Sequence, residues 1–581
     1  MKAARRLVRF AAFLILAAAA GCRGSQRKTV FPSAPVLLIS VDTLRADHLP
    51  AYGYSGVATP HLDDLRKDAI LFENAYTHVP LTLPSHVALM TGVLPPQNGV
   101  RDNIGYRLGP QPETLAGFLG HHGYATGAAV SSAVISRVTG INRGFELYDD
   151  DIEPTAMDQT IGRLRRDGSE TAERIEKWIA SVDTRPFLAF FHTYDCHTPY
   201  EPPEPYRSRY PLAYDGAIAR TDEVIGGLLD MLRQRGLYDR TVVIFLADHG
   251  EGLKDHGEEE HGVLLYRETI HVPLMIKLPG QNRGGSRVAT PVALTDVFPT
   301  LAQMLGLAAP AGLPGIPLVT PDGKLPVRRI YSETLYPRLH LGWSDLASLE
   351  DDRYHYIEAP RSELYDMVAD PGERKDLSPA LPPAFRSMRI ALSQMARPVQ
   401  APGSADPEQV KKLAALGYLS GSASDLTTRD LPDPKDRIGA VEELKQAFGA
   451  LKDQRYEEAA KRFKAIVKDN PRMVDVWQLL AQADLKLSRD EEALAALLQA
   501  AKLSPGNPQV LLALSEYYRV TGDFKKAREH AELARDAGAL DAHENLARIA
   551  LAQGDSKTAE SEARAALQEH PNRRIPHLVL A

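Results

Sequence analysis

Residues 36–42 read VLLISVD, a nearly continuous apolar run that ends on a carboxylate. Two later segments share this pattern. FLAFF at 187–191 is followed by a histidine, and VVIFL at 242–246 is followed, after one alanine, by Asp248-His249. Short, continuous runs of β-branched and aromatic residues are typical of strands that are buried on both faces of a parallel sheet. We therefore predict three such strands, each with polar side chains near its carboxyl end.

Amphipathic segments at 169–182 and 217–235 lie between these runs and predict helices. Alternation of buried strands with helices is typical of an α/β sandwich. In such sheets ligands bind at the carboxyl ends of the strands. Because all three runs place aspartate or histidine there, the pattern predicts an enzyme.

The chain has 581 residues, of which 44% are hydrophobic and 25% are charged, and its net charge is −7. This is the composition of a globular protein, and the length suggests about three to four domains. Nothing in the charge distribution indicates a surface for nucleic acid, so we expect no nucleic-acid partner.

The first 22 residues have the features of an export signal. Lys2 and three arginines precede an apolar run from Phe10 to Ala20, and Gly21-Cys22 follows. This run is short for a membrane span, which needs about 20 residues. A charged start, a short apolar centre and small residues before a cysteine predict a signal peptide, and its end resembles a bacterial lipobox.

We therefore expect lipidation of Cys22 and a polar tether at 23–34. The protein would then be an exported lipoprotein that is anchored to a membrane of the cell envelope and faces the periplasm, with the outer membrane preferred. A plain secretory signal and an uncleaved anchor are the alternatives.

A 34-residue period runs through the segment 437–581. Intervals of 34, 34 and 32 residues separate Ala459, Ala493, Ala527 and Ala559. Small residues at this period, where paired helices touch, resemble tetratricopeptide repeats. The resemblance implies an all-α solenoid of stacked helical hairpins that binds a protein or peptide partner. An unspecific helical bundle is the alternative.

The predicted strand ends supply ligands for a cation. Asp42, Asp248 and His249 offer two carboxylates and one imidazole, which suit a hard or borderline divalent metal. The hydroxyl of Thr82 can add a fourth ligand, and coordination would lower its pKa and align it for attack on an ester. A single aspartate at a strand end is often a helix cap, but this combination favours one divalent ion, either Mn²⁺, Zn²⁺ or Ca²⁺.

Five segments occur in the order that sulfatases share. They are VDTLRAD at 41–47, TLPSHVALMTG at 82–92, DCHTPY at 195–200, ADHGE at 247–251 and YRE at 266–268 with VPL at 272–274. Over residues 35–380 the chain thus resembles the sulfatase family. The resemblance implies a catalytic domain with the alkaline-phosphatase-like fold. We expect a smaller antiparallel region at 330–378 and a linker at 381–436 that wraps this domain.

The resemblance also implies roles for single residues. Asp42, Asp248 and His249 match metal ligands, and His197 matches a histidine that contacts the ester and its leaving group. Phosphonate monoester hydrolases of this family place an asparagine 21 residues after the nucleophile and a lysine 12 residues after the metal histidine, and these positions hold Asn103 and His261.

We expect Asn103 and His86 to contact the substrate, and His197 and His261 to act in both binding and catalysis. A second metal held by Asp195, His197 and His261 is the alternative, although the spacing of these residues supports it poorly.

Three positions depart from the sulfatase pattern. Thr82 replaces the residue that sulfatases oxidise to formylglycine, His86 replaces an arginine, and Thr43 stands where many sulfatases have a further metal-binding aspartate. Oxidation of threonine would give a ketone and not an aldehyde, so the usual sulfatase nucleophile cannot form. The Thr82 hydroxyl can still attack an ester directly.

The sequence therefore predicts a metal-dependent ester hydrolase that acts on a phosphoester more readily than on a sulfate ester, with an envelope glycan or lipid as a suitable substrate. Threonine with one metal also resembles the phosphoethanolamine and phosphoglycerol transferases, so a transferase is one alternative. A non-catalytic scaffold that recruits partners through the repeats is another.

Overall fold

The computed structural model describes residues 29–152, 165–395, 397–399, 402, 428, 430–539, 541–569 and 574–581. The expected signal peptide at 1–22, with Cys22, lies outside these residues, as do parts of the expected tether and linker. Among the described helices, none has the length and hydropathy that a bilayer crossing needs.

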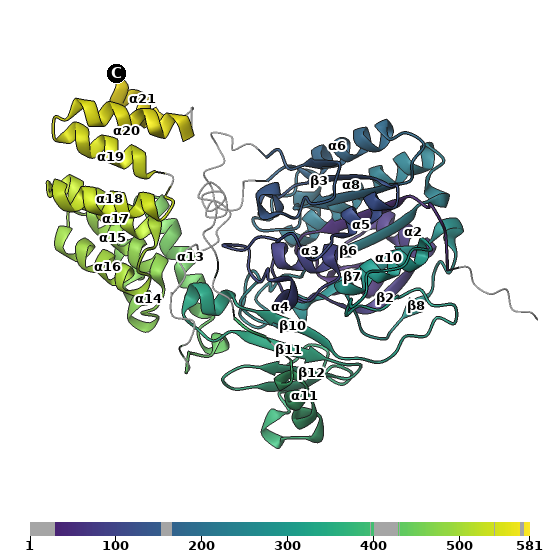
Figure 1. The fold of residues 1–581 in the computed structure, drawn as a ribbon. Coiled ribbons are helices and arrows are strands. Elements are labelled where there is room, and N and C mark those ends of the chain that lie inside the picture. The colour runs from purple at the N-terminus through teal and green to yellow at the C-terminus, as the bar shows by residue number, and fades with distance from the viewer. Residues whose placement is uncertain are drawn as a thin grey trace, which may run out of the picture.

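A mixed sheet of nine described strands forms the centre of the α/β domain (Figure 1). The strand order is β4-β3-β5-β1-β6-β7-β2-β8, and β9 pairs with β2. Strands β4, β3, β5, β1 and β6 are parallel, whereas β7 is antiparallel to both β6 and β2. The strands are Val36–Val41 (β1), Ala69–Tyr76 (β2), Ala125–Val130 (β3), Leu147–Asp149 (β4), Phe187–Thr193 (β5), Val242–Ala247 (β6), His271–Lys277 (β7), Arg287–Val288 (β8) and Val292–Ala293 (β9).

The three predicted strands are confirmed and lie side by side in this sheet. Every residue of β1, β5 and β6 is buried, as expected for strands that helices cover on both sides. Val41 at the end of β1 pairs with Thr193 of β5 and with Ala247 of β6. This register places Asp42 and Asp248 next to each other, one residue beyond the paired strand ends.

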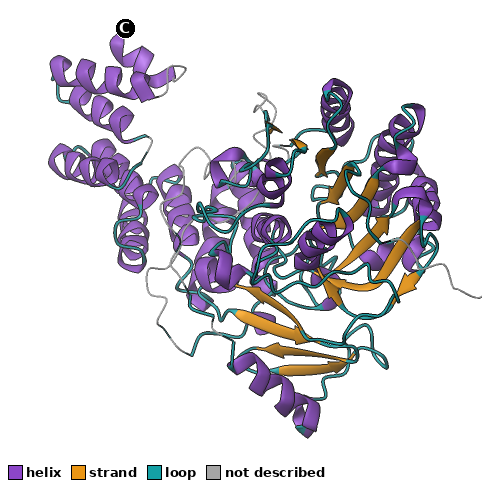
Figure 2. Cartoon of the chain, turned by 45° about the vertical axis from the view of Figure 1, so that its right-hand side comes forward, coloured by secondary structure: helices purple, strands orange, loops and turns teal. Residues whose placement is uncertain are grey.

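Helices lie on both sides of the sheet (Figure 2). Helix α8 packs against α2 and α6, while α3 packs against α5 and α10. The predicted helices at 169–182 and 217–235 are α6 and α8, and α8 begins four residues earlier than predicted. The helices are Pro60–Asp68 (α2), Thr82–Thr91 (α3), Pro95–Asn98 (α4), Leu115–His121 (α5), Gly168–Ser181 (α6), Tyr206–Arg209 (α7), Ala213–Gln234 (α8), Arg267–Ile270 (α9) and Val297–Met304 (α10).

The antiparallel region predicted at 330–378 forms a second sheet of four described strands in the order β10-β11-β12-β13. Helix α11 packs on it, although its residues fall in the segment that we predicted as linker. Pro383 is the first residue of α11, a position where proline starts a helix instead of breaking one. The elements are Ile330–Thr334 (β10), Leu346–Glu350 (β11), Tyr354–Glu358 (β12), Glu363–Asp366 (β13) and Pro383–Ser393 (α11).

The C-terminal residues form the predicted solenoid of helical hairpins, in which α13 pairs with α14, α15 with α16, α17 with α18 and α19 with α20. Ala459, Ala493, Ala527 and Ala559 are at most 2% exposed, so each lies where two helices approach closely. The helices are Gly439–Lys452 (α13), Tyr456–Asp469 (α14), Val474–Lys486 (α15), Asp490–Leu503 (α16), Pro508–Thr521 (α17), Phe524–Asp536 (α18), Ala542–Ala552 (α19), Ser556–Glu569 (α20) and Arg574–Leu580 (α21).

The first repeats pack directly on the α/β domain. Trp343, which precedes β11, belongs to the same buried apolar cluster as Phe463 of α14. Its indole Nε1 donates a hydrogen bond of 2.9 Å to Oδ1 of Asn470. Among the repeat helices, α13 lies closest to the α/β domain in Figure 1.

Candidate active site

Three predicted metal ligands meet at the carboxyl ends of β1 and β6. One ligand atom from each of Asp42, Asp248 and His249 lies within 4.8 Å of the others, and all three side chains are buried. The meeting follows from the strand register, because Asp42 and Asp248 each continue a paired strand by one residue.

The two carboxylates of this cluster have the properties of an ion-binding site. Oδ1 of Asp42 and Oδ2 of Asp248 are buried and have no hydrogen-bond partner. Burial raises the pKa of Asp42 to about 7, and burial together with the charge of Asp42 raises the pKa of Asp248 well above its usual range. Since two buried like charges are costly unless a cation offsets them, these residues fit a divalent metal.

The remaining carboxylate oxygens are held by the protein. Oδ1 of Asp248 accepts hydrogen bonds from the backbone N–H groups of Thr43 and His249, at 3.3 and 2.9 Å. Nε2 of His192 donates to Oδ2 of Asp42 at 3.3 Å. These bonds orient the carboxylates so that one oxygen of each remains for a ligand.

Thr82 is the first residue of α3, and its Oγ1 lies 3.4 Å from Nε2 of His249. Nδ1 of His249 donates to the carbonyl oxygen of Gly250 at 3.0 Å, so Nε2 carries the lone pair that faces Thr82. The amino end of a helix favours negative charge. Thr82 therefore combines a position beside the carboxylate cluster with a position where an anionic ester is stabilised.

Asn103 lies beside this helix start. Its Oδ1 accepts a hydrogen bond of 2.9 Å from the backbone N–H of Leu83, the residue after Thr82. Its Nδ2 is buried and has no hydrogen-bond partner. A buried amide donor next to the nucleophile position is suited to an oxygen of a bound ester.

His86 lies behind Thr82, one helical turn along α3, and both of its ring nitrogens are already engaged. Nδ1 donates to the carbonyl oxygen of Thr82 at 2.7 Å, and Nε2 accepts from the hydroxyl of Ser40 at 2.9 Å. This geometry differs from the substrate contact that we expected. It makes His86 a positioning residue for the backbone at Thr82.

His197 and His261 lie on one side of the cluster. Their ring centroids are 5.1 Å apart, and the ring of His261 is 4.3 Å from that of His249. Nδ1 of His261 donates to Oε1 of Glu251 at 2.9 Å. Burial works against a charge on His261, but the carboxylate of Glu251 outweighs burial and raises the pKa of His261.

His197 has the opposite electrostatic character. Burial, with a contribution from the neighbouring charge of His261, lowers its pKa well below the usual range. Nδ1 donates to the carbonyl oxygen of Thr198 at 2.8 Å, while Nε2 is buried and has no hydrogen-bond partner. The site thus pairs a histidine that favours its charged form, His261, with a neutral histidine that presents a lone pair, His197.

The side chains of Thr43 and Asp195 lie outside the cluster. The Thr43 hydroxyl donates to the carbonyl oxygens of Asp42 and Cys196, both at 2.8 Å. Asp195 accepts from the backbone N–H of Gly168 at 3.2 Å and from the hydroxyl of Thr193 at 3.0 Å, which holds the start of α6. Among the described residues, no metal-binding group joins Asp195, His197 and His261.

Sequence reasoning assigned no role to Glu251 or Arg45, although both lie within the quoted segments. Oε2 of Glu251 accepts from the hydroxyl of Tyr200 at 2.9 Å, so its two oxygens link His261 to Tyr200. Arg45 donates to the backbone carbonyl oxygens of Glu251 and Gly252. The sequence did offer a signal for both, because Arg45 lies three residues after Asp42 and Glu251 lies two residues after His249.

The Sulfatase family model matches residues 35–307, and the Tetratricopeptide repeat model matches residues 444–508 and 512–574. Arylsulfatase K of Bos taurus is 23% identical over 466 residues, which cover 65% of this chain and 85% of that protein. The delta 4,5-hexuronate-2-O-sulfatase of Bacteroides thetaiotaomicron is 25% identical over 414 residues, which cover 59% of this chain and 84% of that protein.

Solved structures agree with this assignment at the level of the fold. A phosphonate monoester hydrolase of Agrobacterium radiobacter superposes with a TM-score of 0.53 at 22% identity, covering 62% of this chain and 94% of that chain. Residues 35–307 thus match the Sulfatase family, whose members are metal-dependent, and the chain combines a sulfatase-like ester hydrolase domain with tetratricopeptide repeats that follow it.

Proposed function

We propose that this protein is a metal-dependent phosphoester hydrolase in which Thr82 is the nucleophile. The observation that carries the proposal is the position of Thr82 Oγ1, at the amino end of α3 and 3.4 Å from Nε2 of His249, beside two buried carboxylate oxygens without partners. Asp42, Asp248, His249 and Thr82 would hold one divalent ion, either Mn²⁺, Zn²⁺ or Ca²⁺.

The identity of residue 82 favours phosphate over sulfate. A formylglycine hydrate can expel sulfate by collapsing to its aldehyde, whereas a sulfate ester of threonine has no such route. A phosphoryl ester of threonine can instead be resolved by attack of water on phosphorus. The solved relative from Agrobacterium radiobacter is a phosphonate monoester hydrolase, so this fold also hosts chemistry at phosphorus.

The metal, when bound, lowers the pKa of the Thr82 hydroxyl and offsets the charge of the ester oxygens. Thr82 loses its proton to solvent, its oxygen forms a bond to phosphorus, and the bond from phosphorus to the leaving alcohol breaks. Water then attacks phosphorus and gives a proton to His261, which is neutral after the first step, while the bond to the Thr82 oxygen breaks and that oxygen regains a proton from solvent. The amide Nδ2 of Asn103 and the amino end of α3 stabilise the charge that develops on the ester oxygens.

The two histidines divide the proton transfers according to their surroundings. His261, whose pKa is raised by Glu251, donates a proton to the leaving alcohol. His197, whose pKa burial lowers, presents the lone pair of Nε2 and accepts a hydrogen bond from the attacking water. This pairing of opposite pKa shifts gives each residue a distinct role in one reaction.

We further propose that the enzyme is an exported lipoprotein, anchored through Cys22, that acts on a glycan or lipid of the cell envelope. The charged and apolar pattern of residues 1–22 supports this location. A Cys22→Ala protein should leave the membrane fraction and lose labelling by a fatty-acid analogue. If that protein stays in the membrane fraction with its label, the lipid anchor at Cys22 is refuted.

The reaction is tested by assaying the protein without residues 1–24 on aryl phosphomonoesters, phosphodiesters and sulfate esters, with each metal added in turn. We expect metal-dependent phosphoesterase activity that Thr82→Ala abolishes and Thr82→Ser retains in part. Thr91→Ala, at the other end of α3, is the matched control and should keep full activity.

Other outcomes of this assay would contradict the proposal in distinguishable ways. Turnover of sulfate esters that depends on Thr82 would refute the preference for phosphate. Transfer of the phosphoryl group to added glycerol or ethanolamine faster than to water would identify a transferase. A purified protein that binds no metal and cleaves no ester would favour the scaffold alternative.

A further inference from the structure

An acidic loop, residues 251–262, borders the candidate active site. The loop begins at Glu251 and contains His261. These two residues bond to each other beside the cluster of Asp42, Asp248 and His249. Its two arms are joined by backbone hydrogen bonds from Gly252 to Glu260 and from Leu253 to Glu259. The segment 251–260 has five acidic residues and one lysine. Although burial raises the pKa of Glu258, the other four acidic residues leave the segment negative, which is unfavourable beside a site for an anionic ester.

The catalytic domain holds the inner side of the acidic loop through Arg45. Nη1 of this arginine donates to the carbonyl oxygens of Glu251 and Gly252, and Nη2 forms an ion pair of 2.7 Å with Asp255. The guanidinium is buried, with 5% of the side chain exposed. Arg45 also pairs with Asp47 at 2.7 Å, so its charge is shared between the two aspartates, and its bonds fix the start of the loop.

The tetratricopeptide repeats hold the outer side of the same loop. Nζ of Lys445, on α13, lies 2.8 Å from Oε1 of Glu260 and 3.1 Å from Oε2 of Glu259. Its side chain is 33% exposed. Ile438, directly before α13, packs on the loop at Gly257, where an added Cβ would lie 3.2 Å from its Cγ2.

Apolar packing fixes α13 in this position. Leu444 and Ala447 of α13 belong to the same buried cluster as Val263 and Tyr266, which follow the loop. Burial and the charge of His261 lower the pKa of His197, and the positive charge of Lys445 adds to that effect. The geometric link from Lys445 to the site is Glu260, which pairs with Lys445 at 2.8 Å and directly precedes His261 in the chain.

We propose that Lys445 is a positioning residue of the active site, supplied by the repeat domain, which clamps the acidic loop and offsets its negative charge when an anionic ester binds. This inference rests on the proposed function for its substrate. Glu259 and Glu260 adjoin His261, so their pairing with Lys445 holds the segment that presents His261 and lessens repulsion of the ester. The repeats are then part of the catalytic unit as well as a surface for a protein or peptide.

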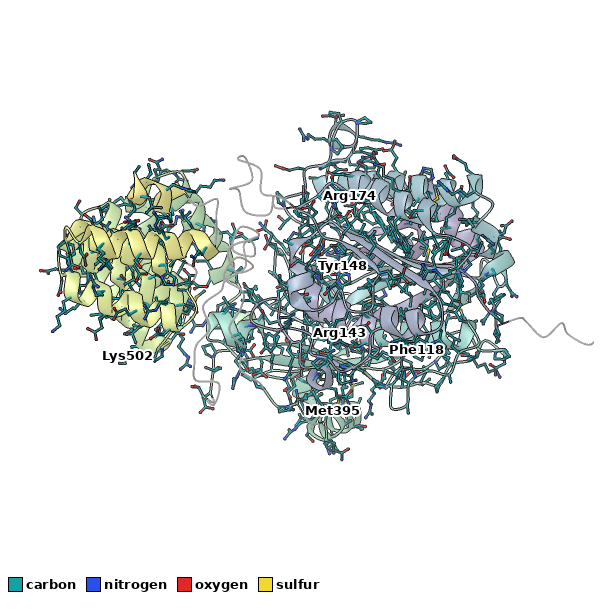
Figure 3. All side chains as sticks on the ribbon, turned by 45° about the horizontal axis from the view of Figure 1, so that its top comes forward. Phe118, Arg143, Tyr148, Arg174, Met395 and Lys502 are labelled. Atoms are coloured by element: carbon teal, nitrogen blue, oxygen red, sulfur yellow. The ribbon has the colours of Figure 1, made fainter. Side chains whose placement is uncertain are left out.

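The test compares Lys445→Met with Lys502→Met in the protein without residues 1–24. Methionine keeps the apolar stem and removes the charge. Lys502 is an exposed lysine on α16, away from the catalytic domain (Figure 3). A charge-swapped protein, Lys445→Glu with Glu260→Lys, and the conservative variant Lys445→Arg test whether the ion pair itself is responsible.

Two kinds of quantity are measured: the kinetic constants KM and kcat for an aryl phosphodiester, and the rate of hydrogen exchange of the backbone amides of the acidic loop. We expect Lys445→Met to raise KM about fivefold with little change in kcat, and to speed exchange at Gly252 and Leu253 about fivefold. Lys502→Met should change neither quantity. The charge-swapped protein and Lys445→Arg should restore both.

The inference is overturned if Lys445→Met leaves the exchange of the loop as in the wild type, or if neither restoring variant recovers KM and exchange. Exchange is measured without turnover. A wild-type protein that cleaves no phosphoester would therefore refute the proposed function, while the exchange result would still decide whether Lys445 clamps the loop.

Discussion

At the scale of single residues, Asn103 holds the first turn of α3, and we propose that it also binds the substrate. Its Oδ1 accepts from the N–H of Leu83 and its buried Nδ2 has no partner in the protein. We predict that Asn103→Ala lowers the free energy of unfolding by about 1 kcal/mol and lowers kcat/KM about tenfold or more. Denaturant unfolding and steady-state kinetics measure the two effects.

Thr114→Ala is the matched control for this prediction. Thr114 caps α5 by accepting from the N–H of Gly117 at 3.1 Å. Its loss should cost a similar free energy of unfolding and leave kcat/KM unchanged. If both variants lose stability and activity in the same proportion, Asn103 acts through the fold alone.

A second prediction at this scale concerns Asp248. Its replacement by asparagine should weaken metal binding and raise the stability of the metal-free protein. Asp248→Asn keeps Oδ1 for the N–H groups of Thr43 and His249 and replaces the unpartnered Oδ2 by a donor that faces Nε2 of His249 at about 3.5 Å. We expect the metal-free variant to unfold at a higher Tm than the metal-free wild type. Added Mn²⁺ should raise the Tm of the wild type and not of the variant.

Asp195→Asn is the control, because Asp195 holds the start of α6 and lies outside the cluster. Its Tm should still rise with Mn²⁺. An Asp248→Asn protein that is stabilised by Mn²⁺ as strongly as the wild type would contradict the assignment of Asp248 as a ligand.

The sequence predicts the part of the site that depends on strand ends. Asp42, Asp248 and His249 meet because they continue paired strands, and this is visible as apolar runs that end on polar residues. The environment of His86 is not visible in this way, since its bonds to Ser40 and to the Thr82 carbonyl depend on how α3 packs over β1. The hydrogen bond between His261 and Glu251 likewise depends on how the loop folds, so the sequence alone does not predict it.

At the scale of elements, Glu258 in the acidic loop gives a prediction for pH. Its oxygens accept from the N–H groups of Val263 and Leu264, and burial raises its pKa from 4.5 to about 8. Because the folded state holds this proton more tightly than the unfolded state, the free energy of unfolding should fall as pH rises between these values. The loss should be roughly 3 kcal/mol between about pH 5 and pH 8.

Glu258→Gln removes this titration, so its stability should decline less over the same pH range than that of the wild type. Denaturant unfolding at several pH values measures the difference between the two proteins. Equal pH dependence in both would show that Glu258 titrates in the folded protein as it does in the unfolded chain.

The spacing of apolar residues predicted the strands that are buried on both faces and the helices that are buried on one face. The strands β1, β5 and β6 and the helices α6 and α8 follow from apolar runs and amphipathic spacing. Helix α11 was missed because its segment is rich in proline, although Phe385, Met388 and Leu392 form the buried stripe that packs on the second sheet. A proline at the start of a helix is easily mistaken for a helix breaker unless the spacing of the apolar residues that follow it is also considered.

At the scale of the whole molecule, Trp343 and Asn470 couple the repeats to the catalytic domain. Trp343→Phe removes the donor to the buried Oδ1 of Asn470 and leaves a cavity. We predict that it weakens docking by about 2 kcal/mol or more. In calorimetry the repeats should then unfold at a lower temperature than the catalytic domain, whereas the wild type should unfold with the two transitions closer together.

Trp477→Phe is the control, because the indole of Trp477 donates to the carbonyl oxygen of Pro471 within the repeats. It should shift the unfolding of the repeats without changing the docking contact. If both tryptophan variants separate the two transitions to the same extent, Trp343 does not couple the domains.

Both domains could be predicted from the sequence, but the contact between them could not. The 34-residue period and the sulfatase-like segments each identify one domain without reference to the other. The ion pairs of Lys445 with Glu259 and Glu260 join residues far apart in the chain and on different domains, and neither repeat periodicity nor catalytic motifs constrain such a pairing.

The central claim is that the Thr82 oxygen forms a covalent bond to phosphorus during turnover. The most direct measurement is mass spectrometry of the protein after brief reaction with an aryl phosphodiester and metal, followed by quenching in acid. We predict a phosphoryl adduct on Thr82 that appears with substrate and is absent from Thr82→Ala. Undiminished turnover by Thr82→Ala, or a wild-type protein that turns over with Thr82 unmodified, would contradict it.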